Sequence, residues 1–486
     1  MFNPTTLIDG YKLDHRRQYP AKTEYVYSNW TPRGSRTGQK EVVFFGLQYF
    51  LERYLGEEWE KFFTTPKEEA AAKYKRRVDG YLGPNEIGTE HIEELWDLGY
   101  LPLRFKALPE GSLVPLRVPM LTVENTHPDF AWLVNYFETL MSSTLWMPCT
   151  SATTAFVYRG ILEEYAKQTG SPIEFVDWQG HDFSFRGMAG PEAAAMSGAG
   201  HLLAFTGTDT IPAIDFLEEY YDGASTFVGG SVAATEHSVM CAGGDESEQE
   251  TFQRLIDLYP AGILSVVSDT WDLWKVLTVI VPNLKDQILA REGKLVIRPD
   301  SGDPVKIICG DPEAVPGTPA FKGVIELLWD TFGGTETEKG YKVLDAHVGA
   351  IYGDSITVER LDQILYGLKQ KGFASANMVF GVGSFTYQYT TRDTYGFAMK
   401  STWVQIDGVG REIFKNPVTD DGLKKSAKGR IAVINEAPEG ARPHYVAVDQ
   451  QDSENPDDEL HIVWENGKFI KHYSLDEVRT TLRNFL

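Results

Sequence analysis

Side chains that could do chemistry are spread through the 486-residue sequence between residues 183 and 430. Carboxylates can bind Mg²⁺ or ribose hydroxyls, arginines, lysines and exposed backbone N–H groups can bind phosphates, and an aromatic ring can stack on a flat base. The residues of these types are Asp209, Asp269, Asp300 and Asp354; Arg186, Arg298, Arg392 and the basic run Lys424, Lys425, Lys428 and Arg430; Gly353, Gly381 and Gly383; and Phe183 with Phe185. Together they indicate a nucleotide-like ligand that carries several phosphates.

Each of these residues also has an ordinary structural explanation. Asp269 could cap a helix that begins at Trp271, and Asp300 could belong to a turn in RPDSGDP. His237, which follows Glu236 in ATEHS, could be a structural histidine. The GVG of FGVGSF lacks the third glycine of a dinucleotide-binding fingerprint. No HExxH, GxSxG, P-loop or kinase signature is present, so the common protease, hydrolase and ATPase classes are excluded.

Short apolar runs precede most of these polar residues. The runs are IEFVD, LLAFTGTDT, GILSVVSDT, KLVIRPD, VGAIYGDS and NMVFGVGS, and helical patterns such as VERLDQILYGLKQKG separate them. Uniformly apolar strands that alternate with helices are typical of a parallel sheet. Both an open doubly wound sheet and a closed barrel would bring the polar residues to the carboxyl ends of the strands, where ligands bind.

The segment KLVIRPDSGDP shows how one strand could serve both packing and binding. Residues 295–297 are predicted to be core, and residues 301–304 a turn. Arg298 and Asp300 are two positions apart, so on an extended strand end both can point to the same side. We expect them to contact one ligand.

The regions on either side of these runs have other patterns. Residues 66–80 predict an exposed helix bounded by proline and glycine, and residues 88–123 alternate between helix-like and strand-like pieces. After Asp393, STWVQIDGVGREIFKNPV and GRIAVINEAPEGARPHYVAVD predict hairpins, and Ser474 predicts the start of a final helix. The flanking regions are therefore predicted to be α+β.

Composition restricts the class of protein. The formal net charge of −23 argues against a general nucleic-acid or anionic-membrane binder. Three dispersed cysteines, Cys149, Cys241 and Cys309, exclude a disulfide framework and a sulfur-based zinc site and suit a reducing cytosol. The N-terminal segment has no signal-peptide core, and no apolar run approaches the roughly 18 residues of a membrane helix. We expect a soluble cytoplasmic protein.

Fourteen segments, in order, resemble the nicotinamide phosphoribosyltransferase family between Asp9 and Arg479. They are DGYKLDHRRQYP, FFGLQYFL, LTVENTHPD, HDFSFRG, GTDT, SVAATEHS, SVVSDTWD, IRPDSGDP, GDSI, FGVGS, TRDT, FKNPV, SAKGR and YSLDEVR. The resemblance implies transfer of a phosphoribosyl group from phosphoribosyl pyrophosphate (PRPP) to the ring nitrogen of nicotinamide, which gives nicotinamide mononucleotide and pyrophosphate.

The resemblance also implies a fold and an assembly. It implies an irregular parallel α/β barrel domain, residues 146–394, and an α+β domain built from the N-terminal region, 1–145, and the C-terminal region, 395–486. It further implies a homodimer whose active sites lie at the subunit interface.

The nicotinamide-binding residues follow from the same resemblance. Phe183 would stack on one face of the nicotinamide ring and Tyr11 of the partner subunit on the other. Asp209 would accept a hydrogen bond from the carboxamide and repel the carboxylate of nicotinate. Ser265 is also implied to bind substrate.

The resemblance places the remaining residues around PRPP. Arg186, Arg298 and His237 would face the pyrophosphate, and Asp300 and Asp354 would hold ribose hydroxyls. The backbone at Gly353, Gly383 and Ser384, with Arg392, would hold the 5′-phosphate. The anionic end of the ligand would be closed by the partner subunit's Lys400, the partner subunit's Lys415 and the partner subunit's Lys424. Asp9 and Asp269 are candidates for the Mg²⁺ environment. Coupled ATP hydrolysis would phosphorylate His237, with Glu236 as its orienting partner.

The sequence departs from the family pattern in places, and alternatives to the main prediction remain. Ser384 and Phe385 replace glycines in the phosphate-binding segment, Ala398 replaces a serine, and Ala233 and Thr235 alter the stretch before Glu236. These changes bear on 5′-phosphate affinity and ATP coupling. The competing interpretations are a nicotinate phosphoribosyltransferase, a barrel enzyme for a sugar phosphate, and a binding protein that retains the fold.

Overall fold

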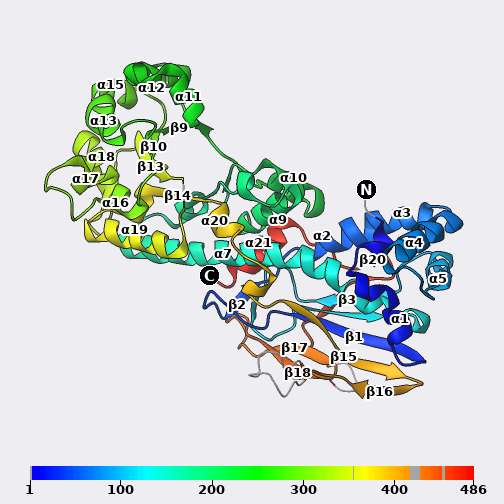
Figure 1. The fold of residues 1–486 in the computed structure, drawn as a ribbon. Helices are drawn as coiled ribbons and strands as arrows, with labels where there is room; N and C mark the ends of the chain where they lie inside the picture. Colours follow the sequence, from blue (N-terminus) through cyan, green and yellow to red (C-terminus); the bar gives the residue numbers. More distant parts are fainter. Residues whose placement is uncertain (1–2, 354, 416–426, 451–454) are drawn as a thin grey trace. The chain divides into compact units, whose positions relative to one another are not determined.

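The structure is a computed structural model that describes residues 3–353, 355–415, 427–450 and 455–486. These residues form two compact units (Figure 1). The α+β unit comprises Met1–Thr153, Phe216–Thr226 and Thr390–Leu486, and the barrel unit comprises Thr154–Asp215 and Phe227–Tyr389. The boundaries expected at 145/146 and 394/395 stay predictions. Asp354 and Lys424 lie outside the described residues.

The α+β unit is built on a seven-stranded antiparallel sheet in the order β16-β15-β1-β5-β3-β19-β20. Its strands are β1 (Thr23–Thr31), β3 (Leu103–Ala107), β5 (Leu121–Asn125), β15 (Ala398–Ile406), β16 (Val409–Glu412), β19 (His461–Glu465) and β20 (Lys468–Phe469). Two further pairs are β2 (Glu41–Val43) with β4 (Leu113–Pro115) and β17 (Ile431–Asn435) with β18 (Tyr445–Asp449). The sheet thus joins strands from both ends of the chain.

Helices of the α+β unit come mostly from the first 140 residues. They are η1 (Pro4–Thr6), η2 (Gly10–Asp14), α1 (His15–Gln18), α2 (Leu47–Tyr49), the π-helical η3 (Phe50–Glu58), α3 (Trp59–Thr64), α4 (Lys67–Leu82), α5 (Glu90–Leu98), η4 (Pro128–Phe130), α6 (Leu133–Tyr136), η7 (Gly223–Ser225), η11 (Arg392–Thr394) and α21 (Leu475–Arg483). The predicted helix at residues 66–80 is α4, and Ser474 caps α21 in a capping box with Glu477.

The barrel unit is built on a parallel sheet in the order β7-β6-β14-β13-β10-β9-β8. Its strands are β6 (Gly180–Asp182), β7 (Gly207–Thr208), β8 (Ala233–Ala234), β9 (Leu264–Val267), β10 (Leu295–Arg298), β13 (Val348–Tyr352) and β14 (Met378–Val382). A parallel bridge between Gly207 and Gly230 joins the β7 edge to the segment that leads into β8. The sheet therefore curls round on itself, which confirms the predicted fold class of an irregular α/β barrel.

Helices cover the outside of these strands, as Figure 1 shows for α12, α13, α18 and α19. The helices of this unit are η5 (Ile173–Phe175), α8 (Val176–Gln179), η6 (Phe185–Gly187), α9 (Pro191–His201), α11 (His237–Gly243), η8 (Asp245–Ser247), α12 (Glu248–Leu258), α13 (Leu273–Lys275), the π-helical η9 (Val276–Ile280), α14 (Val281–Asn283), α15 (Lys285–Leu289), α16 (Pro304–Cys309), α17 (Pro319–Lys322), α18 (Val324–Phe332), α19 (Val358–Gln370), η10 (Ser375–Asn377) and α20 (Ser384–Tyr387). A hairpin of β11 (Gly334–Glu336) and β12 (Lys342–Leu344) lies between β10 and β13 in the sequence.

Two helices continue from one unit into the other along the chain, namely α7 (Glu138–Thr169) and α10 (Ile211–Tyr220). Among the described helices, none combines the length and the apolar character needed to cross a membrane.

One expected strand is wrong, and another is shorter than expected. Residues 173–177 lie in η5 and α8, and within LLAFTGTDT only Gly207–Thr208 form a strand, β7, while residues 202–205 follow the end of α9. A short apolar run cannot be assigned to helix or strand by periodicity alone. The actual strands, β6 and β7, are only three and two residues long. β6 is held by pairing with β14 on one side and β7 on the other rather than by an apolar pattern.

Candidate active site

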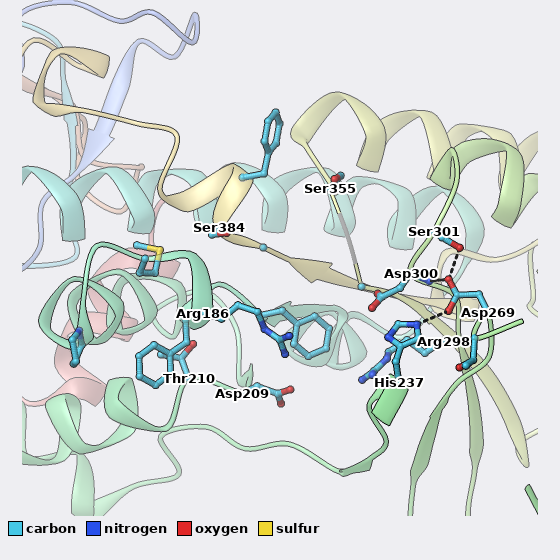
Figure 2. Close-up of a pocket in the computed structure, with 18 of the residues that line it drawn as sticks. Arg186, Asp209, Thr210, His237, Asp269, Arg298, Asp300, Ser301, Ser355 and Ser384 are labelled. Carbon is cyan, nitrogen blue, oxygen red and sulfur yellow. Dashed lines mark hydrogen bonds and ion pairs between the residues drawn. The ribbon is translucent and has the colours of Figure 1, made fainter. Parts of the chain in front are cut away.

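The carboxyl ends of the barrel strands open onto a cavity of about 1030 Å³ (Figure 2). Its walls bring together many of the residues that the sequence singled out, because parallel strands present their carboxyl ends on one side. They are Phe183, Arg186, Asp209, His237, Asp269, Arg298, Asp300, Gly353, Gly383 and Ser384. A second cavity of about 310 Å³ shares Phe183, Asp209 and Arg298 with it and also includes Ser265.

Asp209, directly after β7, lines both cavities. Its Oδ1 accepts a hydrogen bond from the Ser231 hydroxyl at 2.7 Å and lies 2.9 Å from Nε2 of His181. Burial opposes ionisation, but the hydrogen bonds from His181 and Ser231 outweigh it and hold the pKa of Asp209 below its ordinary value. Among the described residues Oδ2 has no hydrogen-bond partner, so a charged oxygen remains for a ligand N–H.

Phe183 lies beside this carboxylate. Its ring is tilted against that of His181, with 4.6 Å between ring centroids. Gly381 of β14 also leaves room for the ring, because a Cβ there would lie 2.4 Å from a Phe183 ring carbon. The hydroxyl of Ser265 is buried and has no partner among the described residues. This end of the site therefore offers an aromatic surface beside unused polar atoms, which suits a flat ring with a polar substituent.

Arg298 and Asp300 both line the large cavity, as expected for two positions on one side of a strand end. The guanidinium of Arg298 donates through Nη2 to the carbonyl of Thr235, while its Nε is buried without a partner among the described residues. Gly353, after β13, lies against Asp300: a Cβ at Gly353 would be 2.3 Å from Asp300 Oδ1. Only glycine allows the carboxylate of Asp300 and this backbone to approach so closely.

Asp269 is the centre of a hydrogen-bond cluster visible in Figure 2. Its Oδ2 accepts from the backbone N–H of Asp300 at 2.9 Å and from the hydroxyl of Ser301 at 2.5 Å. Its Oδ1 lies 3.3 Å from Nε2 of His237. The nearby helix α13 is capped by Asp272 instead. Asp269 thus joins the loops after β9 and β10 to the histidine at the start of α11.

Glu236 is oriented differently from the expectation that it orients His237. Its Oε1 accepts a hydrogen bond from Ser238, and Glu236 is not among the residues that line the cavity. The hydrogen bond of His237 goes to Asp269, which reaches it from another strand end. The structure therefore gives the orienting position to Asp269.

The far end of the cavity is formed by Arg186 in η6 and by Gly383 and Ser384 at the start of α20. Arg186 is exposed and has no hydrogen-bond or ion-pair partner among the described residues. Gly187 packs against Ser384, since a Cβ at Gly187 would lie 2.0 Å from the Ser384 hydroxyl. Two segments about 200 residues apart are thus held together at a cationic, phosphate-sized position.

The other predicted site residues, Asp9, Tyr11, Arg392, Lys400 and Lys415, belong to the α+β unit. Asp9 accepts a hydrogen bond from Thr139 at 2.6 Å. Tyr11 is largely exposed. Partial desolvation of its hydroxyl, together with nearby carboxylates, raises its pKa. Burial lowers the pKa of Lys400, whose Nζ lies 3.8 Å from Glu138 Oε1. Arg392 pairs with Asp393 at 3.1 Å.

Among the described residues, no group of three or more His, Cys, Asp or Glu side chains is placed to hold a metal ion unaided. Mg²⁺ keeps several waters and is usually bound by one or two carboxylates together with substrate phosphates. Asp269 and Asp300, side by side in the cavity wall, fit that kind of donor set.

His181, Ser231 and Ser301 contribute to the site although the sequence did not single them out. His181 lies two positions before Phe183 in HDFSFRG, so strand alternation could have placed both side chains on one side. Ser231 follows the Gly230 bridge, and no local pattern marks it. Ser301 was assigned to a turn, and its hydroxyl bonds to Asp269.

Comparisons with known proteins agree with this geometry. The family described as "Nicotinate phosphoribosyltransferase (NAPRTase) family" matches residues 178–468, and "Nicotinamide phosphoribosyltransferase, N-terminal domain" matches residues 3–94. A nicotinamide phosphoribosyltransferase of Acinetobacter baylyi is 55% identical over 99% of this chain and 97% of its own length. One from Mycoplasma pneumoniae is 38% identical over 87% of this chain and 94% of its own length.

Two solved structures share the fold. The nicotinate-nucleotide pyrophosphorylase of Pyrococcus furiosus matches with a TM-score of 0.60 and 15% identity over 99% of this chain and 96% of its own. Human nicotinic acid phosphoribosyltransferase matches with a TM-score of 0.57 and 16% identity over 98% of this chain and 93% of its own. At this identity the likeness concerns the fold alone. From the sequence relatives, the chain belongs to the nicotinate phosphoribosyltransferase (NAPRTase) family and, within it, to the nicotinamide phosphoribosyltransferases.

Proposed function

We propose that the protein transfers the phosphoribosyl group of PRPP to nicotinamide and releases nicotinamide mononucleotide and pyrophosphate. The observation that carries the proposal is Asp209, which lines both cavities together with Phe183 and whose Oδ2 has no hydrogen-bond partner among the described residues. Relatives that cover nearly the whole chain bear the name of this activity.

In this proposal nicotinamide lies against Phe183 with its carboxamide toward Asp209. The amide N–H donates to Asp209 Oδ2, while His181 and Ser231 hold Oδ1. Nicotinate would bring a carboxylate against an ionised carboxylate, which costs binding free energy without any compensating hydrogen bond. The site thus selects the amide by repulsion as well as by attraction.

The chemical step needs little proton transfer. The lone pair of the nicotinamide ring nitrogen forms the new bond to the anomeric carbon, and the electron pair of the broken C–O bond leaves with pyrophosphate. Positive charge develops on the ribose and negative charge on the leaving group. Arg186 and Arg298 stabilise the departing pyrophosphate, and the carboxylate of Asp300 holds ribose hydroxyls. Orientation of the ring against Phe183 positions the nitrogen for attack.

Asp269 and Asp300 would hold Mg²⁺, the metal that this reaction calls for. When bound, it supplies charge neutralisation to the leaving group. Asp9 stays a second candidate for the metal environment.

ATP coupling through His237 is a further part of the proposal. Donation from Nε2 to Asp269 would leave the lone pair of His237 on Nδ1. That nitrogen would attack the γ-phosphorus of ATP and form an N–P bond, with ADP as the leaving group. Incubation with γ-labelled ATP should label the wild type and Glu236→Gln but not His237→Ala. Label retained in His237→Ala would overturn this role.

A homodimer would bring Tyr11, Lys400, Lys415 and Lys424 of the partner subunit to the site. Tyr11→Ala and Phe183→Ala homodimers should both be nearly inactive. Mixing them under exchange conditions should restore part of the activity, because each mixed dimer contains one site with both aromatic residues intact. A mixture that stays inactive although mixed dimers form would contradict a shared site.

Product analysis tests the main proposal. The protein is incubated with nicotinamide, PRPP and Mg²⁺, with and without ATP, and nicotinamide mononucleotide and pyrophosphate are measured. Equal amounts of the two products are expected. If the protein makes the nicotinate product in preference, the alternative suggested by the family description holds instead.

A further inference from the structure

Another cavity lies in the α+β unit, and none of the residues that line it has a role in the proposed reaction. It has a volume of about 470 Å³ and lies among η1, the end of η3, α3 and α4. Figure 1 shows α3 and α4 next to each other in blue. We call it the α3–α4 cleft and define it by Glu58, Lys61, Phe62, Lys73, Arg76 and Arg77.

The spacing of residues on α4 explains the character of this cleft. Ala71, Tyr74 and Val78 form the buried stripe of the helix. Ala70, Lys73 and Arg77 follow a neighbouring stripe with helical spacing, so one small residue and two cations face the cleft. Phe62 and Ala70 are only 4% and 6% exposed and form its apolar floor. The cleft therefore has a closed apolar base beneath a cationic wall.

Local ion pairs leave a net positive charge in the cleft. Lys61 pairs with Glu58 at 2.8 Å, and Lys73 pairs with Glu69 at 2.7 Å. Arg76 and Arg77 have no ion pair or hydrogen bond with any residue that the structure describes. In a chain with a net charge of −23, two adjacent unpaired guanidinium groups beside a cavity are an unusual use of positive charge.

Glu58 provides a second observation, a buried carboxylate oxygen that an ordinary solvated helix face does not contain. Its side chain is 7% exposed, and its Oε1 is bound by Arg53 at 2.6 Å and Lys61 at 2.8 Å. Its Oε2 is buried and has no hydrogen-bond partner among the described residues. A buried acceptor without a partner costs free energy, which a ligand hydroxyl would recover.

We propose that the α3–α4 cleft binds a small phosphate ester that also carries hydroxyl groups, of the size and chemistry of a mononucleotide. Arg76 and Arg77 bind the phosphate, Glu58 Oε2 accepts from a sugar hydroxyl, and the Phe62–Ala70 floor contacts the apolar part of the ligand. The volume lies within the range of small-molecule sites. This proposal does not depend on the proposed reaction.

Calorimetric titration of the full-length protein with adenosine monophosphate tests the site. The Arg186→Ala/Arg298→Ala variant serves as background, because it removes both arginines that line the barrel cavity. Arg76→Gln/Arg77→Gln should weaken binding by about tenfold or more, the loss expected when charge-assisted contacts are removed. Lys67→Gln/Lys75→Gln removes the same charge from the same helix, but these lysines pair with Asp97 and Asp79 outside the cleft. This control should bind within about twofold of the background.

Three comparisons decide the outcome. Adenosine should fail to bind, and pyrophosphate should bind more weakly than adenosine monophosphate, because it lacks the hydroxyl for Glu58. The single variants Arg76→Gln and Arg77→Gln should each weaken binding at least about threefold, so a folding defect in the double variant does not decide the result. The proposal is overturned by an absence of binding, by equal losses in both double variants, or by pyrophosphate binding as tightly as the nucleotide.

Discussion

Two carboxyl groups, Glu110 in the α+β unit and Asp209 in the barrel unit, show how differently the two regions use an acidic side chain. Glu110 lies between β3 and β4 and accepts hydrogen bonds from the backbone N–H groups of Gly46 and Gln48, at 2.7 Å each, and from the Tyr221 hydroxyl at 2.8 Å. Burial raises its pKa to about 7. Asp209 has a side chain that is 43% exposed and a pKa below its ordinary value.

The difference lies in which atoms remain unused. Both oxygens of Glu110 are bound within the chain, and they tie the turn before α2 to Tyr221 from a distant segment. Asp209, which lines both cavities, is held through Oδ1, and its Oδ2 has no hydrogen-bond partner among the described residues. Arginines show the same contrast: Arg159 is bound by Glu163, Asp177 and the carbonyl of Ala204, whereas Arg298 keeps a buried Nε without a partner. Polar side chains with an unused hydrogen-bonding atom mark the site, whereas side chains whose polar atoms are all bonded within the chain stabilise the fold.

The largest expected effect is a difference between substitutions of Arg298, which should lower activity, and of Arg159, which should lower stability. Arg298→Ala should lower kcat/KM about 100-fold or more, because an oriented donor to the leaving group is lost. Its free energy of unfolding should change by about 1 kcal/mol or less. Arg159→Ala should instead cost about 3 kcal/mol of stability, since it removes the main partner of the buried Glu163 and the donor to the carbonyl of Ala204. Steady-state kinetics and urea unfolding of both variants are the measurements. If the two variants lose the same activity per folded molecule, the proposed difference between a binding arginine and a structural arginine is wrong.

The second effect concerns pH and the two acids. The folded pKa of Glu110 lies above its unfolded value, so its contribution to stability is full below about 4.5 and is lost as pH rises through about 7. Relative to Glu110→Gln, the wild type should lose about 3 kcal/mol of unfolding free energy between pH 4.5 and 8. The pKa of Asp209 is lowered, so the stability that its ionised form contributes is lost only as pH falls below the ordinary carboxyl range. The difference in unfolding free energy between wild type and Asp209→Asn should therefore stay constant from pH 8 to 5. A flat profile for Glu110 would contradict the account.

Site residues that follow the longer barrel strands could be predicted from the sequence, whereas those near the shortest strands could not. β9, β10, β13 and β14 have apolar runs, so Asp269, Arg298, Asp300 and Gly353 could be placed at one end of a parallel sheet. β6 reads Gly-His-Asp and has no such run, since its stability comes from pairing on both sides. His181 was missed for that reason, and Ser231 was missed because no local pattern marks the segment after the Gly230 bridge. Tertiary contacts, not local pattern, decide these positions.

A third effect tests the assignment of Asp209 itself. Asp209→Asn should reduce the preference for nicotinamide over nicotinate by about tenfold or more, because the like-charge contact is removed. Glu110→Gln should leave this preference unchanged while lowering stability by about 1–3 kcal/mol. The ratio of kcat/KM for the two bases is the measurement. Unchanged selectivity in Asp209→Asn would take Asp209 out of the base site.

The smallest effect should come from the groups that hold Asp209 Oδ1. His181→Ala and Ser231→Ala should each raise KM for nicotinamide about fivefold and change kcat less, because the carboxylate loses one anchoring hydrogen bond. His347→Ala is the matched control, since His347 bonds to Asp345 at 2.7 Å and lines neither cavity of the barrel unit. A similar rise in KM in the control would show that the effect is not specific to the site.

The most direct test of the central claim is the wild-type preference for the base. Initial rates with nicotinamide and with nicotinate, at fixed PRPP and Mg²⁺, give kcat/KM for each. If Asp209 presents an ionised Oδ2 to the bound ring, nicotinamide should be preferred by about 100-fold or more. Equal use of the two bases, or a preference for nicotinate, would contradict the account.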